Sequence, residues 1–180
     1  MKTQETKWAI DPIHSKVAFK VKHLMISNVL GNFKEFEGQV STDGDDFSTA
    51  EINFSLSAAS IDTEMADRDG HLKSPDFFDA EKYPKITFSG KGMKDLGDEM
   101  FELTGDLTIK DVTKSVTLTV EYGGIMSDPW GNVKAGFSLS GKINRKDFGL
   151  NWNAALEAGG VLVGEEVKIS GDIELAKVVA

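Results

Sequence analysis

The sequence predicts an all-β fold in which an antiparallel sheet of about eight strands closes on itself as a barrel. Three observations lead to this prediction. Apolar residues recur at every second position in many short segments, as they do on one face of a strand. Short turn sequences separate these segments and leave no room for helices between parallel strands. Glycines within the segments favour the tight bends of a barrel over a flat two-sheet sandwich.

The alternation is strongest in seven segments, which span residues 17–23, 52–56, 85–90, 101–109, 116–120, 137–143 and 167–175. Turn-forming residues lie between segments at 43–45, 96–98, 110–113 and 128–132. Because these turns are short, we expect successive strands to pair mostly as hairpins.

Residues 62–72 lack the alternation and predict a short helix, with Asp62 or Thr63 as its N-terminal cap. The acidic Glu64 in the first turn supports this assignment. A turn that begins at a proline follows at 74–79 and carries the adjacent aromatics Phe77 and Phe78. We expect the helix and the turn to cap one end of the barrel together.

The composition sets the broad class of protein. With 180 residues the chain is long enough for one sizeable core, so we expect a single domain over residues 1–180. The net charge of −9, without any cluster of Lys and Arg, disfavours nucleic acid as a partner. No apolar run is long enough for a membrane span. The polar start predicts a cytoplasmic protein, or a periplasmic or secreted one if a leader was removed.

The sequence carries few signals of catalysis or of metal binding. The histidines, His14, His23 and His71, match no metal motif in their spacing, and the chain has no cysteine. Ser15 follows His14 directly, but adjacent residues of a strand point to opposite faces and cannot share a proton. We therefore expect no metal, no cofactor and no catalytic residue.

The densest charged cluster is Asp67, Arg68, Asp69 and His71, on the predicted helix. We expect the arginine to pair with an aspartate and to pin the helix to the rim of the barrel. Two alternatives stay open. One is a hydrolase or isomerase that uses His71 with Asp69 or Arg68 at the mouth of the barrel. The other is a stress-related structural domain whose barrel is filled by its own side chains.

Several blocks between Trp8 and Ala176 follow one another in a characteristic order. They are Trp8-x-Ile10-Asp11-x-x-His14-Ser15, Gly31-x-Phe33-x-x-Phe36-x-Gly38, Arg68-Asp69-x-His71-Leu72, Phe77-Phe78-Asp79 and Arg145-x-Asp147-Phe148-Gly149. In these blocks the chain resembles the YceI-like family, also described as polyisoprenoid-binding proteins with a lipocalin-like barrel. The resemblance implies non-catalytic binding, sequestration or transport of a long-chain isoprenoid or a similar amphipathic lipid. Its implied partners are isoprenoids, prenyl quinones and fatty amide-like lipids, and it implies a homodimer.

The alternation and the helix cluster together predict which residues contact such a ligand. On the strands they are Phe19, Val21, His23, Phe33, Phe36, Ile52, Phe54, Leu56, Phe88, Leu107, Phe137 and Leu139. Near the helix they are Arg68, His71 and Phe77. A one-residue error in the register of a strand would move its whole set to the outside.

Overall fold

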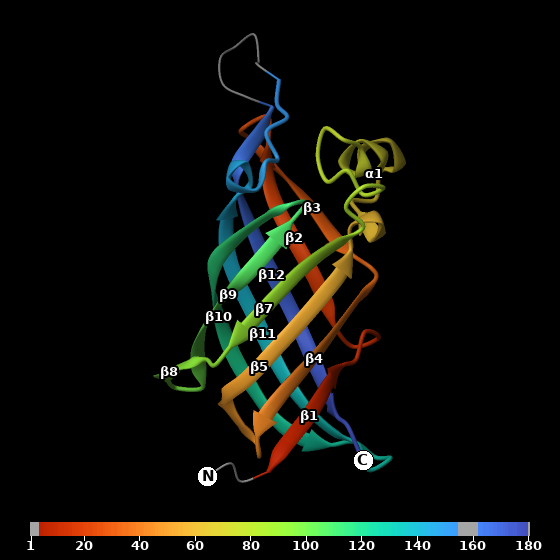
Figure 1. Cartoon of the computed structure of the whole chain (residues 1–180). Coiled ribbons are helices and arrows are strands. Elements are labelled where there is room, and N and C mark those ends of the chain that lie inside the picture. Colours follow the sequence, from red (N-terminus) through yellow and green to blue (C-terminus); the bar gives the residue numbers. More distant parts are fainter. Residues whose placement is uncertain (1–3, 155–161, 180) are drawn as a thin grey trace.

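Eight strands close into an antiparallel barrel, as the alternation predicts (Figure 1). The structure, a computed structural model, describes residues 4–154 and 162–179. Its strands are β1 (Glu5–Ile10), β2 (Lys16–His23), β3 (Ser27–Phe33), β4 (Phe36–Asp43), β5 (Asp46–Ser57), β6 (Ile61–Asp62), β7 (Lys85–Lys91), β8 (Lys94–Gly97), β9 (Met100–Ile109), β10 (Val112–Ser127), β11 (Val133–Asn144) and β12 (Val163–Lys177). Its helical segments are η1 (Ala58–Ser60), α1 (Ala66–Lys73) and η2 (Arg145–Phe148).

The ring runs β1-β4-β5-β7-β9-β10-β11-β12 and closes where β12 pairs with β1. β12 is long enough to pair with β1 near its end and with β2 along its first part. In the same way, β4 pairs with β1 and β3 pairs with β2. β1 and β2 therefore occupy one strand position in the barrel wall, with a bend between them, and β3 and β4 occupy the next position.

Local sequence explains where the strands bend. The break between β1 and β2 contains Pro12, which has no N–H for the hydrogen-bond ladder. β10 runs through 16 residues but shifts its register between Tyr122 and Gly124, where Gly124 has a φ of 103°. Only glycine adopts such a conformation without strain, so the bulge depends on this residue.

Both termini lie at one end of the barrel (Figure 1). This end is closed by the aromatic plug, which we define as Trp8, Phe47, Tyr122 and Phe137. Trp8 is fully buried and donates a hydrogen bond from Nε1 to Thr42 Oγ1 at 3.0 Å. The centroid of the Phe47 ring lies 5.1 Å from that of Trp8 and 4.8 Å from that of Phe137. Tyr122 completes the plug, with its ring 5.6 Å from Phe47.

The helix is shorter than predicted and lies at the opposite end of the barrel (Figure 1). α1 begins at Ala66 after Met65, which makes no side-chain cap, so the predicted cap by Asp62 or Thr63 is wrong. The chain is still extended there, because Asp62 pairs with Asn32 where β6 meets β3. None of the helices within residues 4–154 and 162–179 is long and apolar enough to cross a bilayer.

Candidate functional site

A cavity of about 390 Å³ lies inside the barrel. Its wall carries mainly apolar side chains, from Val120 and Leu175 near the plug to Val21 and Leu72 near α1. Pockets for small ligands have volumes of about 300–1,000 Å³. A barrel filled by its own side chains would have no such cavity, so the filled-barrel alternative is wrong.

The structure places all but one of the predicted contact residues on the cavity wall. Those on strands are Phe19, Val21, His23, Phe33, Ile52, Phe54, Leu56, Phe88, Leu107, Phe137 and Leu139. Those on or after α1 are Arg68, His71 and Phe77. Their contact with a ligand stays a prediction.

Phe36 is the exception, because it does not border the cavity directly. It is the first residue of β4, and its ring packs 6.2 Å from that of Phe54 and against the core around Leu56 and Ile86. Phe36 directly follows the bend between β3 and β4. Phe36 nevertheless pairs with the cavity-lining Leu56 across the strands, so it lies on the inward face that the alternation predicts.

The cavity opens at the α1 end. Lining residues near the plug, such as Val120 and Leu175, are almost completely buried. In contrast, several lining residues at the other end are only half-buried, among them His23, His71, Leu72, Phe78 and Trp152. We call this end the mouth.

α1 is fixed to the barrel through the buried Thr63. Arg68 donates from Nε to Thr63 Oγ1 and from Nη2 to the Thr63 carbonyl, both at 2.8 Å. Asp69 accepts a hydrogen bond from the Thr63 N–H at 2.8 Å. The expected pair between arginine and aspartate is therefore wrong, because each binds the same threonine instead. The expected pinning of the helix is nevertheless present.

His71 lies at the mouth between two aromatic rings. Its ring centroid is 4.6 Å from that of Trp152 and 5.1 Å from that of Phe77. Nε2 bonds to Asp76 Oδ2 at 2.8 Å, on a side chain that is 53% exposed. The enzymatic alternative paired His71 with Asp69 or Arg68, but both of those side chains bind Thr63 instead.

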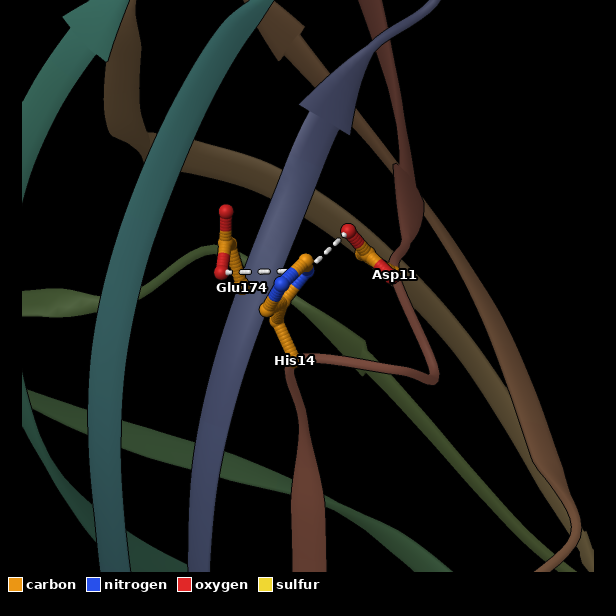
Figure 2. A group of neighbouring side chains, drawn as sticks. All are labelled: Asp11, His14 and Glu174. Atoms are coloured by element: carbon orange, nitrogen blue, oxygen red, sulfur yellow. Dashed lines mark hydrogen bonds and ion pairs between the residues drawn. The ribbon is translucent and has the colours of Figure 1, made fainter. Parts of the chain in front are cut away.

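A second polar cluster lies on the outside of the barrel, where the chain passes from β1 to β2 (Figure 2). His14 Nδ1 is 2.8 Å from Asp11 Oδ2 and 3.9 Å from Glu174 Oε2. Their ligand-type atoms lie within 4.8 Å of one another, as in a metal site. However, Lys134 Nζ is 2.8 Å from the same Asp11 oxygen and supplies the positive charge there. The cluster is therefore an ion-pair network that joins the bend to β11 and β12.

The pKa of His14 reports whether its contact with Asp11 is intact. The hydrogen bond with Asp11 raises the pKa of His14 above its ordinary value of 6.5. A raised histidine pKa stabilises the fold below the unfolded-state pKa, and this effect is lost as the pH rises through the folded-state pKa. We predict that Asp11→Asn lowers the pKa of His14 toward 6.5, as measured by NMR titration of the ring protons.

The matched control is Glu166→Gln, which removes one negative charge from β12 outside the network. It should leave the titration of His14 unchanged. If both variants shifted the pKa equally, the effect would come from net charge and not from the contact with Asp11.

The comparisons with known proteins agree with this architecture. A family model described as the YceI-like domain matches residues 8–175. The chain belongs to the YceI-like family. A UPF0312 protein of Staphylococcus epidermidis is 41% identical over 172 residues, which cover 95% of this chain and 98% of the relative.

Two solved structures support the YceI-like barrel. The Campylobacter jejuni YceI protein is 35% identical with a TM-score of 0.75, over 89% of this chain and 91% of that chain. A polyisoprenoid-binding domain from Saccharophagus degradans is 13% identical with a TM-score of 0.68, over 95% of this chain and 98% of that chain. The second likeness supports the fold alone. The predicted family and the predicted barrel are both confirmed.

Arg145 belongs to a YceI-like block, but the sequence analysis gave it no role. It lines the cavity and is 3% exposed. Its guanidinium donates to the backbone carbonyls of Gly164, Trp152, Val163 and Leu150. Burial lowers its pKa, yet an arginine keeps its proton at neutral pH. The wall thus contains a buried positive charge whose hydrogen-bond partners are neutral.

Proposed function

We propose that this chain binds and sequesters one long-chain isoprenoid, or a similar amphipathic lipid, inside its barrel without catalysing a reaction. The observation that carries the proposal is the apolar cavity of about 390 Å³, closed by the aromatic plug at one end and open at the mouth. The domain of S. degradans that shares this fold is described as polyisoprenoid-binding, and we extend that ligand class to this chain by analogy. Prenyl quinones and fatty amide-like lipids have similar chains and are further candidates.

The free energy of burial favours a ligand with several isoprene units. Each buried CH₂ group contributes about 0.8 kcal/mol, so about three or four five-carbon units contribute roughly 12–16 kcal/mol. Association costs about 4–15 kcal/mol in lost freedom of motion. A single isoprene unit therefore does not suffice, whereas a chain of several units does.

Native mass spectrometry of the gently purified protein tests the proposal. We expect either a lipid that co-purifies with the chain or uptake of an added prenyl quinone at one molecule per barrel. Denaturation should release the bound mass, which then identifies the lipid by fragmentation. If the protein neither carries a lipid nor takes up any of the three candidate classes, the proposal is wrong.

We predict that Arg68→Ala accelerates the exchange of bound lipid. The variant loses both hydrogen bonds to Thr63, so α1 should separate more often from the rim of the mouth. Hydrogen bonds from a charged donor contribute about 1.5–3 kcal/mol each, so the off-rate should rise about tenfold or more. Stopped-flow transfer of a fluorescent polyprenol analogue to acceptor vesicles measures this rate.

Lys73→Ala is the matched control, because Lys73 is on the same helix but does not line the cavity. It should leave the off-rate unchanged. Equal off-rates for wild type and Arg68→Ala would show that α1 is a fixed plug and that the ligand enters elsewhere.

A further inference from the structure

The ionisable side chains on the cavity wall are all basic. Among the described lining residues they are His23, Arg68, His71 and Arg145, while Lys22 borders the cavity with its side chain on the opposite, exposed face of β2. Within residues 4–154 and 162–179, no aspartate or glutamate lines the cavity. The chain as a whole nevertheless has a net charge of −9. The wall therefore does not follow the average composition of the protein, and this contrast calls for a ligand of complementary charge.

Contacts across the mouth bring these basic groups together. His23 on β2 pairs with Val163 on β12. Arg145 donates to the Val163 carbonyl at 3.3 Å and to the Trp152 carbonyl at 3.0 Å. The Trp152 ring in turn lies 4.6 Å from the ring of His71. The basic groups of β2, η2 and α1 thus surround one opening.

Arg68 contributes a guanidinium group whose hydrogen-bond donors are only partly used within the protein. It precedes His71 by three residues on α1, so both side chains lie on one face of the helix. Nε and Nη2 bond to Thr63, whereas Nη1 has no acceptor among the described residues. The two N–H groups of Nη1 are therefore available to a ligand.

The carboxylates near the mouth do not enter the cavity to neutralise its basic side chains. Asp76 bonds to the histidine of α1 but is itself half-exposed, outside the cavity. Asp69 is held by the N–H of Thr63. Glu165 forms an ion pair with Lys146 at 2.8 Å. None of these three carboxylates lines the cavity.

We infer that the mouth binds an anionic head group, a phosphate or a diphosphate, of the lipid whose chain occupies the cavity. The inference rests on the proposed function, because the buried chain is what brings the head to the mouth. A guanidinium forms strong, directional hydrogen bonds with phosphate oxygens. A neutral alcohol or quinone head offers no charge to the arginines. The lipid class favoured by the mouth is therefore a polyprenyl phosphate rather than a prenyl quinone.

The acidic surface of the protein does not cancel this attraction. At physiological salt, charges on the surface are screened beyond about 8 Å. The basic groups of the mouth, in contrast, act at hydrogen-bond distance and in a partly desolvated place. Salt should therefore lower the affinity for the anionic lipid only modestly.

The test compares geranylgeranyl diphosphate with geranylgeraniol, which has the same chain and a neutral head. Binding is measured by calorimetry or by competition in native mass spectrometry. We expect the diphosphate to bind about tenfold to a hundredfold more tightly. Inorganic pyrophosphate alone, at the same concentrations, should show no binding, because it lacks the chain.

Variants assign the preference to the mouth. Arg68→Met should reduce the ratio of the two affinities about tenfold. Any change in the affinity for geranylgeraniol reports the loosened helix, so the ratio of the two affinities isolates the contribution of the head group. Arg68→Lys keeps the charge and should retain part of the preference. Lys73→Met removes one positive charge from the same helix away from the cavity, and should not alter the ratio.

The outcomes separate this inference from the proposed function. Equal affinities of the wild-type protein for the two lipids would overturn the head-group inference and leave the lipid-binding function intact. Binding of neither lipid would overturn both. Pyrophosphate that binds as tightly as the diphosphate lipid would reveal a site for a soluble anion, and the head-group inference would again be wrong. The wild-type comparison alone decides between these results if Arg68→Met does not fold.

Discussion

Phe54→Asp is expected to abolish lipid binding and to lower the free energy of unfolding by about 3–5 kcal/mol at neutral pH. Phe54 lines the cavity from β5, and its cross-strand partner is Phe88 on β7. An aspartate at this place would face apolar side chains with no basic group opposite it. The charged carboxylate would therefore be both desolvated and unpaired.

The pH dependence of this variant has a definite sign. Because burial disfavours the charged form, the new aspartate has a raised pKa in the folded state. Its destabilising effect therefore grows as the pH rises and shrinks as the pH falls toward about 4, where the side chain is protonated. Urea denaturation at several pH values, together with lipid uptake by native mass spectrometry, measures both effects.

Asn53→Asp is the matched control, since Asn53 precedes Phe54 on β5 and, although it also borders the cavity, it is exposed to solvent. It introduces the same charge into the same strand. We expect a change in stability within about 0.5 kcal/mol and normal lipid uptake. Loss of uptake in both variants would show that charge on β5, and not the burial of that charge, is responsible.

Trp8→Ala is expected to destabilise the fold by about 3–5 kcal/mol. Trp8 is fully buried in the aromatic plug, and its truncation would leave a cavity beside Phe47. It would also leave the Thr42 hydroxyl without its donor from the indole Nε1. Thr42 still donates to the Gly44 carbonyl, so the loss of packing should dominate over the loss of the hydrogen bond.

The control for this variant is Trp130→Ala, because Trp130 is 83% exposed in the turn between β10 and β11. Its truncation should change the free energy of unfolding by no more than about 0.5 kcal/mol. Thermal and urea denaturation compare the two variants. A loss below about 1 kcal/mol for Trp8→Ala would mean that the plug rearranges to fill the space.

The face that each strand turns to the cavity could be read from the sequence. Phe54 pairs with Phe88, and Phe88 pairs with Leu107, so three neighbouring strands share one alternation. Because strand pairing preserves the face, one correct assignment supports the next across the sheet. The same consistency holds at Phe36, which pairs with Leu56 and packs against Phe54 on the inward face.

The polar contacts could not be read in this way. Arg68 and Asp69 are adjacent on a helix, and adjacent helical side chains do not face each other. The expected ion pair was therefore geometrically unfavourable, and both side chains bind Thr63. The pair between Asp11 and Lys134 spans 123 residues, and only the closed barrel brings the two together.

The seam between β1 and β12 also determines how the chain must fold. Trp8 lies opposite Lys177 there, so the ring is completed by the pairing of its first and last strands. Contacts between residues so distant in sequence form late, because a long loop must close first. Until β12 docks, the edges of β11, β1 and β2 that pair with it expose unpaired N–H and C=O groups. Such open edges can pair with another copy of the chain. We therefore expect aggregation mainly from the folding intermediate in which β12 has not yet docked. A ligand that binds only the closed barrel does not stabilise this intermediate and does not speed the docking of β12.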